Sequence, residues 1–393
     1  MIYLDHLAST PLDPLVLEAM LPWMRPEAAG NPHAAHRAGW RAADAVEEAR
    51  AEVAALVGAR PGEVVFTSGA TEANALALLG GVPPEGGCIV SAVEHASELA
   101  CLPELRRRGH PVAVLPVDGT GRVDPAELER HLSSLGKPAL VSVMAANNEV
   151  GTIQPLAELA AVAACHGATI HSDAVQALGT LALDMPALGL HGLSLSGHKL
   201  YGPMGIGALV VRPPFRPVPA SAGGSAGGGQ QRGLRGGTLP TPLCVGLGIA
   251  CRLARERREE DARRIAGLRD RLWDRLHDLL GDRLPGLRRN GAADGLAGCL
   301  NVTIPGIDAA DRLLDLPELA ASTGSACHSA AGEPSHVLLA LGLPAADAHA
   351  SLRFGLGRGT TAEEVDAAAA LLAAALSGRG PAGPLRTAGA RRP

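Results

Sequence analysis

Lysine is rare in this chain, and its rarity singles out Lys199 as a residue kept for its amine. Only Lys137 and Lys199 are lysines among the 35 basic residues, and all the others are arginine. A primary amine can bond covalently to a carbonyl compound, whereas a guanidinium stays protonated and is not a nucleophile. Lys137 lies in a Gly-Lys-Pro turn, where we expect it to be solvated. Lys199 ends a Ser-Gly-His-Lys segment directly after an apolar run, which makes it the candidate for covalent chemistry.

Two further clusters could complete a site around that amine. Residues 67–72 read Thr-Ser-Gly-Ala-Thr-Glu between an apolar run and a helical pattern. Backbone N–H groups there, with the hydroxyl of Thr71, could bind a phosphate, although an ordinary capped turn has the same composition. Asp173 ends another apolar run, where it could pair with a protonated pyridine nitrogen or simply cap the next helix. The order of phosphate-binding turn, Asp173 and Lys199 favours the functional interpretation of all three.

The elements that would position these residues alternate between short apolar runs and helix-length segments. Seven runs are predicted to be strands, at residues 64–66, 88–90, 112–115, 140–143, 169–171, 193–195 and 206–211. Helical patterns at 72–79, 97–108 and 125–135 separate several of them. This alternation predicts a mostly parallel sheet with helices on both faces and a ligand at the carboxyl ends of the strands. The connection before the last run is short, so that strand can break the parallel arrangement.

A long charged helix is predicted from Pro240 to about Leu280, and it would link two domains. Beyond it, strands at 300–304 and 351–354 and a helix at 361–376 predict a smaller α+β domain. We therefore predict a large domain over residues 11–250 and a small domain over residues 1–10 and 251–377. Residues 378–393 are rich in Gly, Pro and Arg and are predicted to be a flexible tail.

Composition argues against several classes of protein. A net charge of −5 gives no electrostatic case for direct binding of nucleic acid. No run of about 20 apolar residues is present, and the N-terminus lacks the features of a secretion signal, so we expect no membrane association. The seven cysteines form no CxxC pair and suggest reduced thiols in the cytoplasm. His33 and His36 have no accompanying ligand set, and no metal is predicted.

Taken together, these residues resemble the cysteine desulfurases, in the class V aminotransferase group of fold-type I pyridoxal 5'-phosphate (PLP) enzymes. The resemblance runs from Tyr3 to about Leu376. It is carried in order by residues 30–32, 67–72, 94–95, 147–151, Asp173 with Gln176, 196–199 with 201–203, 235–238, 324–327 and 353–354. It implies an α/β fold, with a mostly parallel seven-stranded sheet in the large domain and a smaller α+β domain. It also implies a homodimer that uses PLP and L-cysteine.

The resemblance also implies a role for each matching residue. Lys199 would bind the cofactor covalently and transfer the substrate's Cα proton, Asp173 would pair with the pyridinium nitrogen, and His95 would stack on the ring and could take part in proton transfer. The surrounding residues fall into three implied sets: Ala70, Thr71, Ser196, His198 and the partner subunit's Thr238 at the phosphate; Asn148 and Gln176 at the cofactor's 3′-oxygen or the substrate; Asn31, Asn148 and Arg353 at the substrate.

Cys327 is the residue that distinguishes this family. It lies in a run of small and polar residues, 322–333, that is typical of an exposed loop, and His328 could raise its thiolate fraction. The resemblance implies that Cys327 takes the sulfur of L-cysteine as a persulfide, leaves alanine, and passes the sulfur to an acceptor protein. That acceptor could serve iron–sulfur assembly or thio-modification. Cys165 and Cys251, on predicted helices, are expected to be core residues.

Two alternatives stay open on the sequence. One is a lyase or aminotransferase of the same fold that does not use Cys327, selenocysteine lyase included. The other is a PLP-binding protein without catalysis, against which the pair Lys199 and Asp173 argues, because binding alone needs no electron sink. Residues 6–10 and Ala34 depart from the family pattern near the expected entrance of the site. The reaction type is therefore better defined than the substrate preference.

Overall fold

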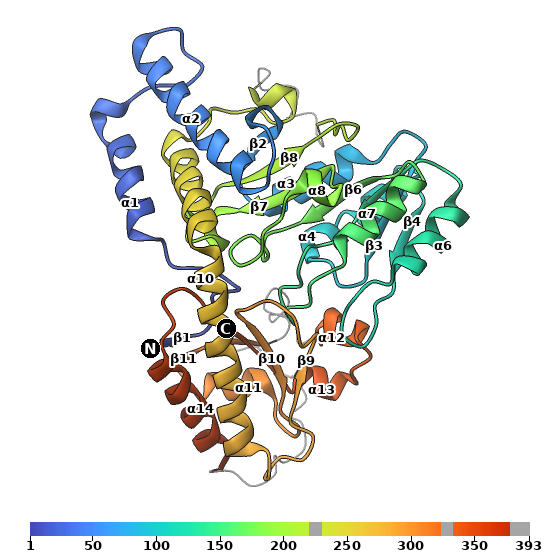
Figure 1. Ribbon diagram of the computed structural model, residues 1–393, viewed down its shortest axis with the longest axis vertical. Coiled ribbons are helices and arrows are strands. Elements are labelled where there is room, and N and C mark those ends of the chain that lie inside the picture. The colour runs from blue at the N-terminus through green and yellow to red at the C-terminus, as the bar shows by residue number, and fades with distance from the viewer. Residues whose placement is uncertain (220–229, 324–332, 378–393) are drawn as a thin grey trace, which may run out of the picture.

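The computed structural model describes residues 1–219, 230–323 and 333–377. Its largest sheet has seven strands in the order β2-β8-β7-β6-β5-β3-β4 (Figure 1). The strands are β2 (Val64–Thr67), β3 (Gly87–Ser91), β4 (Val112–Leu115), β5 (Ala139–Ser142), β6 (Thr169–Asp173), β7 (Gly192–Ser196) and β8 (Gly207–Val211). All seven predicted strands are confirmed. Only β8 runs antiparallel to its neighbours, at the short connection where an exception was expected.

Helices cover both faces of this sheet. One face packs against α3 (Ala70–Gly81) and α5 (Leu102–Arg107). The other packs against α2 (Arg37–Leu56), α6 (Pro125–Leu135), α7 (Leu156–Cys165) and the first half of α10 (Thr241–Leu280). Successive side chains of a strand point to opposite faces, so Val64 and Phe66 enter one core while Val65 enters the other. Burial on both faces explains why the strands read as continuous apolar runs.

The predicted single helix over residues 97–108 is wrong. The chain forms two short helices there, α4 (Ala96–Leu99) and α5. Pro103 lies in the first turn of α5, where its fixed φ and missing N–H are compatible with a helix start but not with a helix interior. The break therefore falls where proline allows it.

A further apolar core, separate from the two that flank the large sheet, lies beyond that sheet. Its antiparallel sheet has the order β12-β13-β10-β9, with β9 (Arg288–Asn290), β10 (Cys299–Thr303), β12 (Ser322–Thr323) and β13 (Ser351–Gly355). The N-terminal strand β1 (Ile2–Tyr3) pairs in parallel with β11 (Leu319–Ala320) beside it. Helix α14 (Ala362–Ser377) covers this part, so the predicted strands and helix are confirmed. The shorter helices are α1 (Pro14–Met20), α8 (Met185–Leu188), α11 (Ala309–Leu314), α12 (His336–Ala340) and α13 (Ala345–His349).

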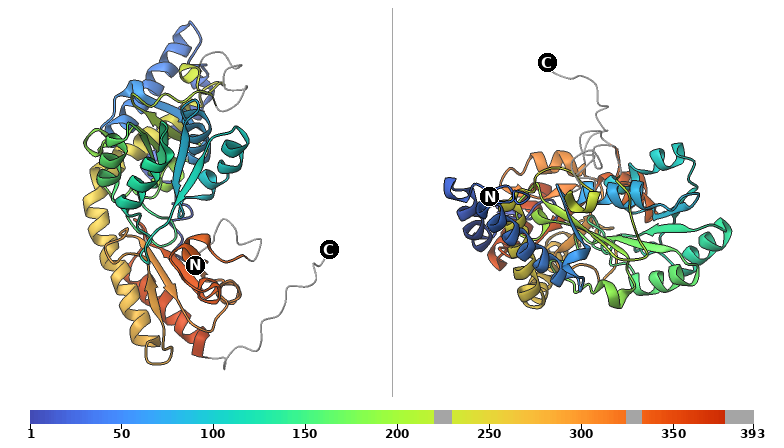
Figure 2. Two further views of the ribbon diagram at one scale, coloured as in Figure 1. Left: turned by 90° about the vertical axis from the view of Figure 1, so that its right-hand side faces the viewer. Right: turned by 90° about the horizontal axis from the view of Figure 1, so that it is seen from above.

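Helix α10 joins the two parts. Its 40 residues pack on α2 at one end and on α14 at the other, and Figure 2 shows it running along one side of the molecule. The separation of the core under α14 from the two cores of the large sheet supports the proposed division into a large and a small domain. Within the part of the chain that is described, no helix has the length and apolar character needed to cross a bilayer.

Candidate active site

The predicted chemical residues meet at one edge of the large sheet. Asp173 is the last residue of β6, and Lys199 ends the short 3-10 helix Gly197–Lys199 that follows the neighbouring parallel strand β7. Strand β2 also runs parallel to β7, because β8 between them is antiparallel to both. Its carboxyl end leads into the turn before α3. The carboxyl ends of β2, β6 and β7 therefore bring the phosphate-binding turn, Asp173 and Lys199 to the same edge.

The Asp173 carboxylate is held by two donors. The side chain is 5% exposed. Asn74 Nδ2 donates to Oδ2 at 2.7 Å, and the Val175 backbone N–H donates to Oδ1 at 2.9 Å. Asp173 thus fixes its own turn as well as presenting a charge. Asn74 was missed from the sequence, although an amide inside an apolar helical segment was a signal that could have identified it.

The Lys199 amine lies against the N-terminal segment. Its Nζ donates to the backbone carbonyls of Leu7 and Ala8, each at 2.6 Å. Gln176, a predicted cofactor or substrate contact, also donates to the Leu7 carbonyl, at 2.9 Å. Residues 7 and 8 belong to the segment that departs from the family pattern, and their part in the site was not predicted. Lys137, by contrast, is exposed, as expected.

The turn before α3 has the character of an anion site. No side chain caps the helix that begins at Ala70, so its first N–H groups are available to a ligand, with exposed Thr71 beside them. Ser196 Oγ lies 2.8 Å from His198 Nδ1 beside Lys199. Burial and the charge of Lys199 lower the pKa of His198 to about 4, so its imidazole is neutral near pH 7. A phosphate here would meet neutral donors and the helix terminus.

Hydrogen bonds through Glu72 connect the turn before α3 to the loop that carries Thr238. Glu72 Oε2 accepts from the Ser68 backbone N–H at 2.5 Å, and Arg235 Nε donates to Glu72 Oε1 at 2.7 Å. Burial alone would raise the pKa of Glu72, but the bonds from Ser68 and Arg235 hold it below its ordinary value. Thr238, three residues after Arg235, is exposed.

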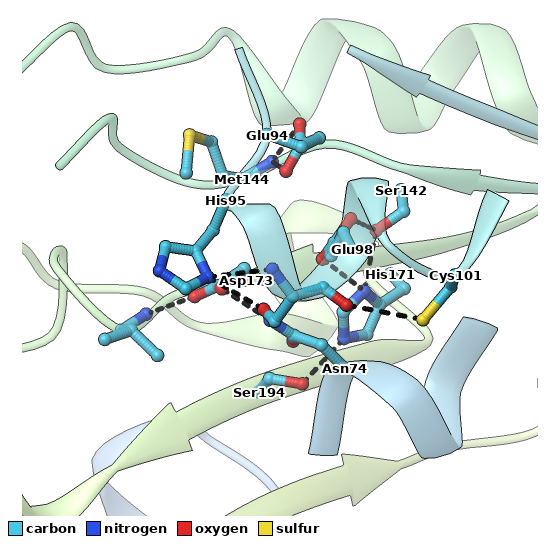
Figure 3. A network of polar contacts seen from close by, with 12 residues as sticks. Asn74, Glu94, His95, Glu98, Cys101, Ser142, Met144, His171, Asp173 and Ser194 are labelled. Carbon is cyan, nitrogen blue, oxygen red and sulfur yellow. Dashed lines mark hydrogen bonds and ion pairs between the residues drawn. The ribbon is translucent and has the colours of Figure 1, made fainter. Parts of the chain in front are cut away.

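His95 lies on the same side of the site as Asp173. Its Nδ1 is 2.8 Å from Ser97 Oγ and 3.1 Å from the Ser97 backbone N, which donates to it. Ser97 Oγ in turn accepts from Asn74 Nδ2 at 3.0 Å. Figure 3 shows His95, Asn74 and Asp173 converging in one network. Because Nδ1 accepts a hydrogen bond from the Ser97 N–H, a neutral His95 carries its hydrogen on Nε2.

The predicted substrate-binding residues are divided between two places. Arg353 on β13 is 2% exposed; its Nη2 lies 2.9 Å from Asp5 Oδ1, and its Nη1 donates to the Asn148 carbonyl at 3.0 Å. A ligand carboxylate would therefore share this guanidinium with Asp5. Asn31 instead lies exposed in the turn before α2, where Oδ1 accepts from the His33 N–H at 2.9 Å.

Cys327 and its neighbours lie outside the described residues. On one side of that segment, Ser322 Oγ donates to Asp5 Oδ1 at 2.8 Å. On the other, Ser335 Oγ donates to Glu149 Oε2, and His336 Nε2 lies 3.0 Å from the Glu94 carbonyl. The expectation that Cys165 is a core residue is wrong: it ends α7 and is exposed, whereas Cys251 is buried.

These side chains fit a PLP cofactor. The buried Asp173 carboxylate, which accepts two hydrogen bonds, suits a pyridinium nitrogen. The Lys199 amine suits the aldehyde of the cofactor. The uncapped start of α3 suits the phosphate. The Asn74 Oδ1 atom is buried beside them without a hydrogen-bond partner in the described structure.

Comparison with known proteins defines the class. The sequence model of the family "Aminotransferase class-V" matches residues 2–368. The chain is 43% identical over 371 residues to a cysteine desulfurase of Rattus norvegicus, covering 93% of this chain and 80% of that protein. A NifS-like protein from Rickettsia africae has a similar structure, with a TM-score of 0.85, 30% identity and coverage of 96% and 99%. The solved structure of SspA in complex with cysteine has a TM-score of 0.77 and 35% sequence identity, and the match covers 91% of this chain and 99% of that one. This chain belongs to the PLP-dependent cysteine desulfurases of the aminotransferase class-V family.

Proposed function

We propose that this enzyme converts L-cysteine to L-alanine and captures the sulfur as a persulfide on Cys327 for transfer to an acceptor protein. The observation that carries the proposal is the meeting of Asp173 and Lys199 at one sheet edge, in a chain whose relatives are cysteine desulfurases. One relative was solved with cysteine bound, which supports cysteine as the substrate.

The chain's own groups would divide the chemistry as follows. When bound, PLP supplies an electron sink for the charge that develops at the substrate Cα. Asp173, oriented by Asn74 and Val175, would keep the ring nitrogen protonated. Lys199 would move the Cα proton after leaving the Leu7 and Ala8 carbonyls, which hold its amine at 2.6 Å. The Cys327 thiolate would then attack the substrate sulfur, so that the S–S bond of the persulfide forms as the Cβ–S bond breaks; the electron pair of the broken bond would stay with the substrate carbons, which take up a proton to become alanine.

Arg353 and Asn148 would hold the substrate carboxylate. The Arg353 guanidinium donates to the Asn148 carbonyl through Nη1 and to Asp5 through Nη2. These two bonds fix the plane of the guanidinium. A planar fork in a fixed orientation suits a carboxylate, because two parallel N–H···O bonds can form. Because Asp5 also accepts from Ser322, the same acid connects Arg353 to the strand that precedes the Cys327 segment.

A homodimer would complete the site. Five large apolar side chains are exposed on α1, on the 3-10 helix Leu21–Met24 and at the start of α2: Leu15, Leu17, Leu21, Met24 and Trp40. Figure 1 shows α1 and α2 together at one side of the large domain. Exposed apolar surface of this kind marks protein interfaces. Thr238, which is exposed near the phosphate-binding turn, would serve the partner's cofactor.

The proposed location is the cytoplasm. The six cysteines within the described ranges are free thiols, which a reducing compartment maintains.

The test of the function is incubation of the purified enzyme with L-cysteine and a reductant, with alanine and sulfide measured together. Equal amounts of the two products support the desulfurase; turnover of L-selenocysteine alone would assign a selenocysteine lyase instead.

A further inference from the structure

A buried acidic cluster lies around Asp173 and consists of Asp173, Glu94 and Glu98. Glu94 and Glu98 are each 0% exposed, and Asp173 is 5% exposed. Figure 3 shows the three side chains in one network with Asn74 and His171. Glu94 accepts from Ser91 Oγ at 2.5 Å and from the Met144 N–H at 3.0 Å, so its acceptors are well supplied. Glu98 has no such supply: no donor reaches its buried Oε1 in the described structure. Burial raises the pKa of Glu98, and the charge and hydrogen bonding of the neighbouring Glu94 carboxyl raise it further.

Ser142 connects Glu98 to a buried histidine. Its hydroxyl oxygen lies 2.8 Å from Glu98 Oε2 and 2.8 Å from His171 Nδ1, and His171 Nε2 lies 2.9 Å from Ser194 Oγ. A hydroxyl carries one proton, so Ser142 can donate to only one of its two neighbours and must accept from the other. In one arrangement a protonated Glu98 donates to Ser142, which donates to Nδ1 of a neutral His171. In the other, Ser142 donates to an ionised Glu98 and accepts from His171 Nδ1–H, and His171 is then either a neutral imidazole that accepts from Ser194 at Nε2 or an imidazolium.

The surroundings favour the neutral arrangement. An ionised Glu98 would be a fully buried anion with a single hydrogen-bond donor, close to two other carboxyl groups. Neutralising it by a protonated His171 at 3.6 Å would bury a second charge, and burial lowers the pKa of His171 to about 3. When Glu98 is protonated, the proton on Oε2 bonds to Ser142, Ser142 to His171 Nδ1, and His171 Nε2–H to Ser194. Every link is then made without a buried charge.

The other titratable groups around Glu98 do not supply a positive charge. They are Glu94 before α4, Asp173 and His171 on β6, Cys88 on β3, and Cys101. Burial raises the pKa of Glu94 to about 8, that of Cys101 to about 11, and that of Cys88 further, so these groups are largely neutral near pH 7. Asp173 differs from Glu94 and Glu98 in its position, because it ends β6 at the sheet edge and is 5% exposed, and Asn74 and the Val175 N–H both donate to it.

We propose that Glu98 is a positioning residue that stays protonated in the native enzyme and confines the negative charge of this cluster to Asp173. A second anion in the cluster would repel the Asp173 carboxylate. It would also draw away from the cofactor the negative charge that pairs with the protonated ring nitrogen. The neutral chain through Ser142 and His171 also braces strand β6, which ends at Asp173. This inference rests on the proposed pairing of Asp173 with the pyridinium nitrogen.

The direct test is infrared spectroscopy of the cofactor-free protein at neutral pH. Because Glu94 is also largely neutral at this pH, we expect the carbonyl absorption of protonated carboxylic acids to lose one component in Glu98→Gln, to keep the component of Glu94, and to be unchanged in Glu48→Gln, a control at an exposed glutamate on α2. Absence of a component assigned to Glu98 would show that Glu98 is ionised and would overturn the proposal, and the NMR signals of His171 would tell whether its imidazole is neutral or an imidazolium.

The holoenzyme provides the second readout. Glu98→Gln keeps a neutral group of the same shape, so its cofactor absorbance should titrate as in the wild type and its kcat/KM should stay within about twofold. Glu98→Leu loses the bond to Ser142 and should lower kcat/KM about tenfold, which corresponds to one lost hydrogen bond. A shifted cofactor titration near neutral pH in Glu98→Gln would mean that Glu98 is ionised there. Asp173→Asn separates the two proposals: full cofactor binding and turnover in that variant would remove the role of Asp173 and leave the infrared result unaffected.

Discussion

The Lys199 amine donates to the backbone carbonyl of Leu7 at 2.6 Å, across 192 residues of sequence. Leu7 follows β1, which pairs with β11 in the small part of the molecule, and Asp5 between them binds Arg353. The N-terminal segment therefore contacts the amine and the candidate carboxylate-binding arginine at once. Any movement of the small domain relative to the large sheet would reach Lys199 through this segment.

The first prediction concerns the amine itself. Lys199→Ala should bind PLP without a covalent bond and should lose turnover, because no other residue at the sheet edge carries a primary amine. Borohydride reduction followed by peptide mapping measures the bond. Lys137→Ala is the control, since Lys137 is exposed in a distant turn, and it should behave as the wild type. A reducible adduct that survives in Lys199→Ala and maps to Lys137 would contradict the assignment.

The sheet could be predicted from sequence because its strands are buried on both faces and read as apolar runs such as Val64–Thr67. The order of motifs was likewise enough to bring Asp173 and Lys199 to one edge. The break between α4 and α5 was missed because residues 97–108 have a helical apolar pattern, although Pro103 marks the start of a new helix.

The parts of the site that escaped prediction have a common physical origin. The Leu7 and Ala8 carbonyls bind Lys199 through backbone atoms, which every residue possesses, so no residue type signals them. Glu98 reads as a solvated helical residue, yet the fold buries it completely. Asn74 acquires its role only when α3 packs beside β6. Tertiary packing, rather than local pattern, gives these residues their contacts.

The second prediction concerns the subunit interface. The protein should be a homodimer, and Thr238→Val should weaken PLP retention because it removes a hydroxyl from the partner's phosphate site. A hydrogen bond to a charged group is worth about 1.5–3 kcal/mol, or roughly 10- to 100-fold in the dissociation constant. Equilibrium dialysis measures the loss, and Thr238→Ser, which keeps the hydroxyl, is the matched control. A fully active monomer in analytical ultracentrifugation would rule the arrangement out.

The third prediction concerns the substrate carboxylate. Arg353→Lys keeps a positive charge beside Asp5 but loses the planar fork, so kcat/KM for L-cysteine should fall by about tenfold or more while the cofactor absorbance is unchanged. Arg288→Lys, on strand β9 of the same sheet and paired with Asp347, is the control and should have little effect. Unchanged kinetics in Arg353→Lys would assign the carboxylate to another residue.

The fourth prediction is a pH dependence of stability. Burial, with the charges of Glu94 and Asp173, raises the pKa of Glu98 well above its ordinary value. Above the unfolded pKa of about 4.3, the native state therefore binds more protons than the unfolded state, and the free energy of unfolding falls as pH rises. Glu98→Gln removes this dependence. The wild type should lose stability relative to Glu98→Gln by up to about 1.4 kcal/mol per pH unit between about pH 5 and the native pKa.

Urea unfolding of both cofactor-free proteins at several pH values measures this difference. His171, whose pKa is lowered by burial, contributes in the opposite direction below its unfolded pKa, but it is present in both proteins and cancels in the comparison. A difference in unfolding free energy that stays constant with pH would show that Glu98 titrates alike in the native and unfolded states.

The last prediction separates a desulfurase from a lyase of the same fold. If Cys327 accepts the sulfur, Cys327→Ala should retain PLP and still bind L-cysteine, because neither step needs the thiol. It should then form little alanine and no protein persulfide. Cys327→Ser should behave alike, since an alkoxide is scarcely available at neutral pH.

Cys165→Ala is the matched control: this thiol is exposed at the end of α7, and its removal should leave turnover unchanged. Mass spectrometry after a stoichiometric pulse of L-cysteine should find one extra sulfur on the Cys327 peptide of the wild type. Release of alanine and sulfide by Cys327→Ala at the wild-type rate would make the enzyme a direct lyase, and the roles proposed for Lys199 and Asp173 would still stand.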